Sequence, residues 1–137
     1  MEVRLADCAG FCFGVKRAVD TVYEQLKNGK TIYTYGPIVH NEEVVRELSE
    51  KGVRVLENKE ELKHLKAGEN IPTVIIRAHG VAKEIYDIME ANGLECIDAT
   101  CPFVKKIHRI VEQKSTEGYH VIVVGDPKHP EVEGIVS

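Results

Sequence analysis

The chain has 137 residues, enough for one ordinary domain or for one complete domain and part of another. Hydrophobic residues make up 43% of the sequence and charged residues 29%, which is the composition of a folded globular protein and excludes a disordered chain. The net charge of -4 gives no general argument for binding to nucleic acid. Trp is absent and the aromatic content is 6%, which leaves few side chains on which bases could stack. We therefore expect no nucleic-acid partner.

The sequence gives no sign of a membrane or a secretory route. No apolar run approaches membrane-spanning length, and residues 1–5 lack the long hydrophobic stretch of a signal peptide. We therefore expect a cytoplasmic protein without a membrane partner. In a reducing compartment, the four cysteines suggest metal or redox chemistry before structural disulfides: Cys8, Cys12, Cys96 and Cys101.

Short apolar strands alternate with amphipathic helices along the chain. The expected strands are 3–6, 31–35, 53–56, 73–76, 95–97 and 120–124. The expected helices are 15–27, 42–51 capped by Asn41, 59–66 capped by Asn58, 82–91 and 102–117, with no helix after the last strand. This alternation predicts an α/β fold of repeated strand-helix units with mainly parallel strands.

Residues that can do chemistry gather in the loops after predicted strands. In open parallel sheets, ligands bind outside the carboxyl ends of the strands, where loops and helix N-termini meet. The residues placed there are Cys12, His40, His79, Cys101, His129, Glu131 and Glu133. For each histidine taken alone, a turn residue bonded to backbone is an equal alternative, but three beside two cysteines favour a common site.

The remaining candidates have ordinary structural explanations. His64 and His108 lie on predicted helices and His120 begins a strand, so we expect them to be solvated or partly packed. Cys96 lies inside a strand, where a small hydrophobe is the simple interpretation. Arg77 and Lys128 could add positive charge to the site, but we expect both at the surface.

Cys101 lies in a strand-to-helix turn, with Pro102 suited to the first helical position. Unpaired backbone N–H groups at such a turn favour a thiolate, which suits a metal ligand or a nucleophile; a small buried cysteine is the alternative. Imidazoles and glycine-rich loops can bind a diphosphate, and thiolates favour zinc, copper or iron-sulfur clusters. Glu131 and Glu133 fit either a solvated acidic loop or, in a dry pocket, a proton donor.

Five short segments, taken together, resemble one known family. They are Gly-Phe-Cys-Phe-Gly-Val at 10–15, Val-His-Asn at 39–41, Ala-His-Gly-Val at 78–81, Asp-Ala-Thr-Cys-Pro at 98–102 and His-Pro-Glu-Val-Glu-Gly at 129–134. With these segments the chain resembles the 4-hydroxy-3-methylbut-2-enyl diphosphate reductase (LytB/IspH) family. The segments occur in the family's order and span essentially the whole chain.

The resemblance implies the last step of the methylerythritol phosphate pathway of isoprene biosynthesis. This step is the reductive removal of an allylic hydroxyl, which gives isopentenyl and dimethylallyl diphosphates, with electrons from a ferredoxin or flavodoxin. It implies a [4Fe-4S] cluster held by three cysteines, of which Cys12 and Cys101 are two. By motif match, His40, His79 and His129 line the diphosphate pocket and Glu131 relays protons.

In one respect the sequence departs from this family. The third cysteine and a later group of Ser, Thr and Asn residues lie beyond the last residue of this chain. The family fold has three α/β units around the cluster. We therefore expect an N-terminal fragment divided into 1–13, a strand and cluster loop that pack with a missing third unit; 14–97, the first α/β unit; and 98–137, an incomplete second unit.

Two other functions remain open from the residues themselves. The four cysteines could form a closed zinc site in a non-catalytic α/β module, although a pair separated by four residues across a strand end is unusual spacing. A plain nucleotide-binding or protein-interaction domain with reduced cysteines is the second alternative. Metal content separates all three: iron with sulfide, zinc, or no metal.

Overall fold

The computed structural model describes residues 2–7, 9–68 and 70–136. Within them, a parallel four-stranded sheet has the order β2-β1-β3-β4. The strands are β1 (Ile32–Tyr35), β2 (Arg54–Leu56), β3 (Thr73–Ile76) and β4 (Glu95–Asp98). The predicted α/β class with parallel strands is confirmed.

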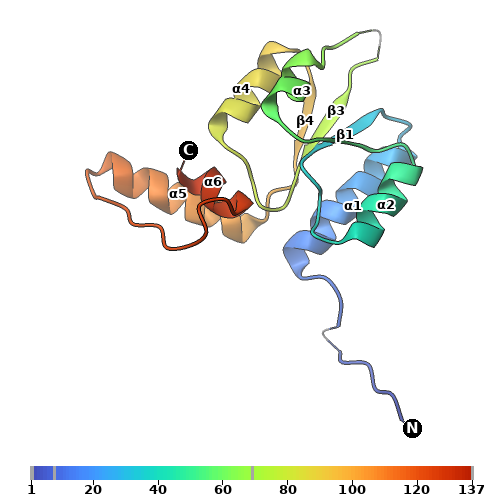
Figure 1. Cartoon of the computed structure of the whole chain (residues 1–137), viewed down its shortest axis with the longest axis horizontal. Helices are drawn as coiled ribbons and strands as arrows, with labels where there is room; N and C mark the ends of the chain where they lie inside the picture. Colours follow the sequence, from blue (N-terminus) through green and yellow to red (C-terminus); the bar gives the residue numbers. More distant parts are fainter. Residues whose placement is uncertain (1, 8, 69, 137) are drawn as a thin grey trace.

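Helices cover both faces of the sheet, as Figure 1 shows. The helices are α1 (Phe13–Lys27), α2 (Glu42–Glu50), α3 (Lys59–His64), α4 (Lys83–Ala91), α5 (Pro102–Thr116) and α6 (Pro130–Val136). Helices α1 and α2 lie on one face, and α3 and α4 lie on the other. Helices α5 and α6 pack together beyond the end of β4. In the described parts of the chain, no helix is long and apolar enough to cross a membrane.

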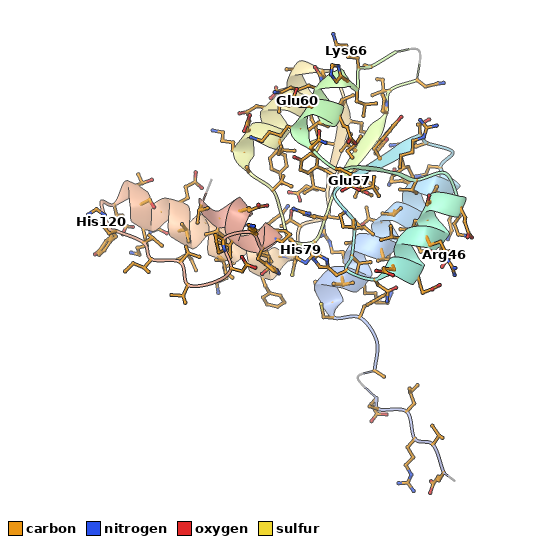
Figure 2. All side chains as sticks on the ribbon, viewed as in Figure 1. Arg46, Glu57, Glu60, Lys66, His79 and His120 are labelled. Atoms are coloured by element: carbon orange, nitrogen blue, oxygen red, sulfur yellow. The ribbon has the colours of Figure 1, made fainter. Side chains whose placement is uncertain are left out.

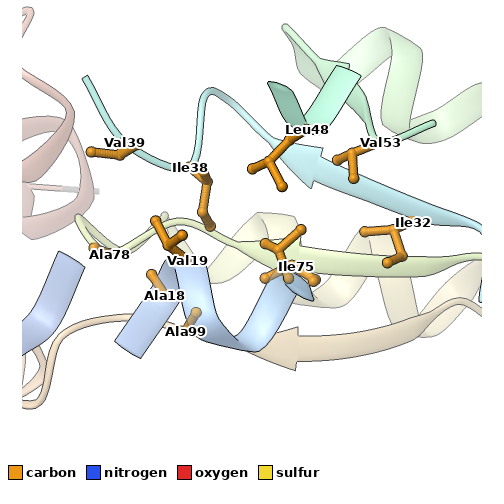
Figure 3. Close-up of a cluster of buried hydrophobic side chains, with 11 residues drawn as sticks. Ala18, Val19, Ile32, Ile38, Val39, Leu48, Val53, Ile75, Ala78 and Ala99 are labelled. Carbon is orange, nitrogen blue, oxygen red and sulfur yellow. The ribbon is translucent and has the colours of Figure 1, made fainter. Parts of the chain in front are cut away.

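The centre of the sheet separates two buried apolar clusters. All four residues of β3 are buried, because this strand has neighbours on both sides and helices on both faces. Ile75 points into the first cluster, together with Ala18 and Val19 of α1 and Leu48 of α2 (Figure 3). Val74 and Ile76, which alternate with Ile75, belong to the second cluster under α3 and α4.

Two asparagines begin helices as the sequence predicts. The Oδ1 atom of Asn41 accepts a hydrogen bond from the backbone N–H of Val44 at 3.1 Å, at the start of α2. Oδ1 of Asn58 accepts from the N–H of Glu61 at 3.0 Å, at the start of α3. Each bond satisfies a donor that a helix start leaves without an intrahelical partner, so both helices begin at defined residues.

Two predicted strands are absent. Residues 3–6 and 120–124 form no strand, and their apolar side chains face outward. Leu5 is 87% exposed and Val124 is 94% exposed. A strand needs a hydrogen-bonded neighbour and an apolar surface to cover, and the described part of the chain offers neither segment such a neighbour.

Helix α6 corrects a second expectation, since we expected no helix after residue 124. Pro130 occupies its first turn, where a missing N–H costs nothing, and Glu131 and Glu133 carry negative charge toward the positive end of the helix dipole. The division at residues 13/14 and 97/98 stays a prediction.

Candidate functional site

The strand order brings three predicted site segments to one edge of the sheet. The loop with His40 follows β1, the loop with His79 follows β3, and the turn with Cys101 follows β4; β1, β3 and β4 are neighbours in that order. After β1 the chain enters α2 on one face, whereas after β3 it enters α4 on the other face. The two loops therefore diverge at the carboxyl ends of the strands, which is where parallel α/β proteins bind ligands.

The three predicted substrate histidines come together at this edge of the sheet. The ring centroids of His40 and His79 lie 4.8 Å apart, and those of His79 and His129 lie 6.0 Å apart with the rings at 89°. Figure 2 shows His79 where the sheet approaches α5 and α6, whereas His120 lies far away at the other end of α5. His64 and His120 are exposed, as expected.

The start of α6 orients His129. Its backbone carbonyl accepts a hydrogen bond from the N–H of Glu133 at 3.0 Å, which makes His129 the residue that precedes the helix. Its Nδ1 atom accepts from the N–H of Glu131 at 3.3 Å. Because Nδ1 accepts in this arrangement, the neutral ring carries its proton on Nε2. His129 therefore offers an N–H donor to a ligand.

The pKa of His79 depends on the charged groups around it. Burial lowers the pKa of His79, positive charge on His40 lowers it further, and Glu131 opposes the change; smaller contributions from Arg77 and His129 also lower it. The net pKa lies below the ordinary value, so the imidazole is neutral at neutral pH. Its Nδ1 atom is buried without a hydrogen-bond partner among the described residues. Such an atom favours a polar ligand or water.

Cys12 and Cys101 occupy equivalent positions on two helices. Cys12 is the residue before α1 and Cys101 the residue before α5, and neither side chain caps its helix. A Cβ atom added at Gly14 would lie 2.6 Å from Sγ of Cys101, so the start of α1 lies directly against this sulfur. The two helix N-termini thus present their N–H groups and the positive ends of their dipoles next to two cysteines.

Three hydrogen bonds fix the turn that carries Cys101. Nη1 of Arg17, on α1, donates to the carbonyl of Thr100 at 3.2 Å. Oδ1 of Asp98 accepts from the N–H of Thr100 at 2.9 Å, and the N–H of Cys101 donates to the carbonyl of Ala78 at 2.9 Å. The cysteine turn is therefore tied both to the helix that begins at Cys12 and to the loop that holds His79.

Asp98 is itself held by a cation. Burial acts to raise the pKa of Asp98, but hydrogen bonds from Lys105 and Thr100 outweigh it and the net pKa is lowered. Nζ of Lys105 lies 2.5 Å from Oδ2 of Asp98. The carboxylate is thus ionised at neutral pH and remains an acceptor for the turn.

Cys96 differs from the two cysteines that precede helices. It lies within β4 as an exposed residue, and partial burial of the sulfur, with the charge of Asp98 beside it, raises the pKa of the Cys96 thiol to about 11. A protonated thiol is a poor metal ligand. No group of three or more His, Cys, Asp and Glu side chains in the described residues is arranged to hold a metal ion. The zinc alternative therefore gains no support from Cys12, Cys96 and Cys101, while Cys8 lies outside the described residues.

Two residues near the site were assigned no role from sequence. Arg17 makes the bond to the cysteine turn, and His108 is partly packed against the loop after β3. Arg77, considered as a possible positive charge in the site but expected at the surface, is half-buried: a Cβ atom added at Gly36 would lie 2.5 Å from its Nη1 atom. Only contacts between distant parts of the chain reveal the roles of Arg17 and His108, and periodicity or spacing carries no such signal.

The fold and the site define a parallel α/β protein with a cluster of histidines at the carboxyl edge of its sheet. Two solved structures are similar to it. One is described as (E)-4-hydroxy-3-methyl-but-2-enyl diphosphate reductase, the terminal enzyme of the non-mevalonate pathway; the TM-score is 0.80 at 45% identity, over 96% of this chain and 44% of that one. The other, E-1-hydroxy-2-methyl-but-2-enyl-4-diphosphate reductase from Plasmodium falciparum, has a TM-score of 0.83 at 37% identity, over 94% of this chain and 39% of that one.

Sequence comparison gives the same relationship. The chain is 51% identical over 137 residues to a protein named 4-hydroxy-3-methylbut-2-enyl diphosphate reductase from Caldanaerobacter subterraneus subsp. tengcongensis, covering 98% of this chain. The chain spans 46% of the length of that relative. Residues 3–137 match the profile of the family described as LytB protein, and the chain belongs to this family.

Proposed function

We propose that this chain supplies part of the active site of a 4-hydroxy-3-methylbut-2-enyl diphosphate reductase. In the proposed reaction, two electrons and two protons are consumed, the allylic C–O bond breaks, the hydroxyl leaves as water, and isopentenyl or dimethylallyl diphosphate forms. The observation that carries the proposal is the convergence of three imidazoles beside Glu131, on the same sheet edge as Cys101. The relative of which this chain covers 46% is itself named 4-hydroxy-3-methylbut-2-enyl diphosphate reductase.

The histidine cluster suits a diphosphate. Neutral imidazoles donate N–H groups to phosphate oxygens, and His129 is oriented to do so through Nε2. The lowered pKa of His79 leaves it neutral in the free protein, and a bound diphosphate would favour its protonated form. Arg77 also contributes positive charge that His79 senses. The cluster can thus bind an anion with little permanent charge of its own.

The two cysteines that precede α1 and α5 fit an iron-sulfur cluster of the [4Fe-4S] type. A cluster held by thiolates carries negative charge, and the N-termini of α1 and α5 place unpaired N–H groups at Cys12 and Cys101. When bound, such a cluster supplies single electrons and an iron atom that can accept the substrate oxygen. The third cysteine of the proposed site would come from the length of the relatives that this chain does not cover.

Glu131 is the proposed proton donor. It is half-buried in the first turn of α6, and its charge acts on His79, which supports a position near the histidine cluster. The backbone bond from its N–H to Nδ1 of His129 ties the two side chains to one turn. A carboxyl in this position can deliver a proton to a departing hydroxyl. A ferredoxin or flavodoxin as donor and a cytoplasmic location complete the proposal.

Metal analysis tests the cofactor. We would purify the chain without oxygen and measure iron, acid-labile sulfide and zinc. Iron with matching sulfide supports the proposal, and stoichiometric zinc favours the four-cysteine module instead. An empty protein leads to the same assay on a polypeptide of the relatives' full length, where absence of iron would contradict the proposal.

Glu131→Gln tests the proton donor in that longer polypeptide. The amide keeps the shape of the side chain but cannot supply the proton, so turnover should fall by about 100-fold or more while iron content stays unchanged. Glu24→Gln, an exposed position on α1, is the matched control and should retain activity. Loss of the cluster in Glu131→Gln would remove the proton-donor assignment.

A further inference from the structure

His108 connects two segments of the histidine site. It lies on α5, about two turns beyond Cys101. A Cβ atom added at Gly80 would lie 3.3 Å from Cε1 of His108, and one added at Gly134 would lie 3.2 Å from the same atom. One edge of the imidazole therefore contacts two glycine backbones that are far apart in the sequence.

Each glycine belongs to a segment that carries site residues. Gly80 directly follows His79, has a φ of +75°, and is also held by Cγ2 of Thr100, which a Cβ atom there would meet at 3.1 Å. Gly134 is buried on α6, one turn after Glu131. The loop of His79 and the helix of Glu131 are thus both packed on the same imidazole.

The imidazole of His108 has an unpaired polar atom in its position between Gly80 and Gly134. Its Nε2 atom is buried without a hydrogen-bond partner among the described residues, and leaving a polar atom unpaired costs free energy that an apolar side chain would avoid. The ring lies close to both glycines, and His108, Gly80 and Gly134 also line a cavity of about 690 Å³. The close contacts with the two glycines are the feature of this side chain that the inference uses.

We propose that His108 is a positioning residue that sets the separation between the His79 loop and α6. It acts through its contacts with Gly80 and Gly134, and so fixes the distance from His79 to His129 and Glu131. This inference rests on the proposed function, because the separation matters only if these residues bind one ligand. His108 touches neither the substrate nor the cluster.

A pair of substitutions isolates the contact. His108→Ala removes the ring and lets the two segments approach each other, whereas Gly134→Ala adds a methyl group against the ring and pushes them apart. In the double variant the new methyl group occupies space that the ring has left. A positioning role therefore predicts that the two changes compensate each other, which independent losses of stability would not do.

The measurement is calorimetric binding of inorganic diphosphate, without oxygen, to the cluster-containing enzyme in a polypeptide of the relatives' full length. Each single variant should bind about tenfold more weakly than the parent, and the double variant should regain part of the loss. In steady state, KM should rise more than kcat falls. His64→Ala, which changes an exposed histidine on α3, is the matched control and should bind like the parent.

Several outcomes would overturn the inference. Unchanged diphosphate affinity in folded His108→Ala would do so, as would strictly additive losses in the double variant. If His108→Ala does not fold, His108→Asn in its place completes the same cycle with Gly134→Ala. If the parent enzyme binds no diphosphate, the histidine site of the proposed function fails and the inference falls with it.

Discussion

Strand β3 and residues 121–124 have nearly the same kind of sequence but opposite structures. Both are runs of β-branched residues, Thr-Val-Ile-Ile and Val-Ile-Val-Val. Ile75 of β3 is fully buried, whereas Ile122 is 84% exposed. The difference lies in the surroundings: β3 pairs with β1 and β4, and residues 121–124 pair with no strand in the described chain. A β-branched run becomes a strand only where neighbouring strands can pair with it and apolar surfaces can pack against it.

The largest expected effect compares the two isoleucines directly. Ile75→Ala should lower the free energy of unfolding by about 2–5 kcal/mol, because it removes methyl groups from a closed core and leaves a cavity. Ile122→Ala should change it by about 0.5 kcal/mol or less. Urea denaturation of the two variants measures both values. Equal losses would show that residues 121–124 are packed as firmly as β3.

Glycine substitutions extend the comparison to the cysteine site. Gly14→Ala would place a methyl group 2.6 Å from Sγ of Cys101 and should cost about 1–3 kcal/mol by displacing the sulfur. Gly68→Ala has no atom within 4 Å to meet and is the control. Denaturation and iron content should both change in the first variant only. Full iron content in Gly14→Ala would separate the packing of α1 from the metal site.

Two asparagines at helix C-termini allow a third comparison. Nδ2 of Asn92, after α4, lies within hydrogen-bond distance of the carbonyls of Leu62, Lys63 and Leu65 at 3.0–3.2 Å. Asn92→Ala should therefore cost about 1–2 kcal/mol by leaving carbonyls of α3 without this donor. Asn28→Ala, at the equivalent position after α1, should cost less. Thermal unfolding would contradict this if the two losses were equal.

The smallest expected effect depends on pH. The folded-state pKa of His79 lies below the unfolded value of about 6.5, so at lower pH the unfolded chain binds more protons. Stability should fall as the pH decreases below about 6.5 and through the folded-state pKa of His79. His79→Gln should flatten this dependence, whereas His120→Gln, in an exposed segment, should not. Unfolding measured from pH 7.5 to about 5 would refute the assignment if both variants behaved alike.

The sheet and the helices α1 to α5 were predictable because their signals are local. Apolar periodicity and the caps Asn41 and Asn58 place those elements within two residues of their observed bounds. Residues 3–6 and 120–124 carry the same signal but lack partners, which no local pattern reports. Helix α6 was missed because Pro130 and Gly134 resemble turn residues when the packing around them is unknown.

The sequence predicted which residues gather at the site better than it predicted which residues hold them in place. The rule that loops meet at the carboxyl edge of a parallel sheet anticipated that His40 and His79 would gather there, after β1 and β3. His129 joins them from the start of α6, because the strand predicted before it at 120–124 is absent. Their roles, and those of Cys12, Cys101 and Glu131, stay predictions. Arg17 and His108 act through contacts with residues distant in the sequence, and composition and spacing contain no information about such contacts.

The bond between Arg17 and Thr100 also constrains the order of events when the protein forms. It joins residues 83 positions apart, and the strands β1 to β4 lie between them. Closing so long a loop is slow and entropically unfavourable until the intervening strands have paired. We therefore expect Arg17 and Thr100 to meet late, after the sheet has formed. Because the same bond holds the turn of Cys101 against α1, we expect this turn to reach its final position only once the sheet is complete.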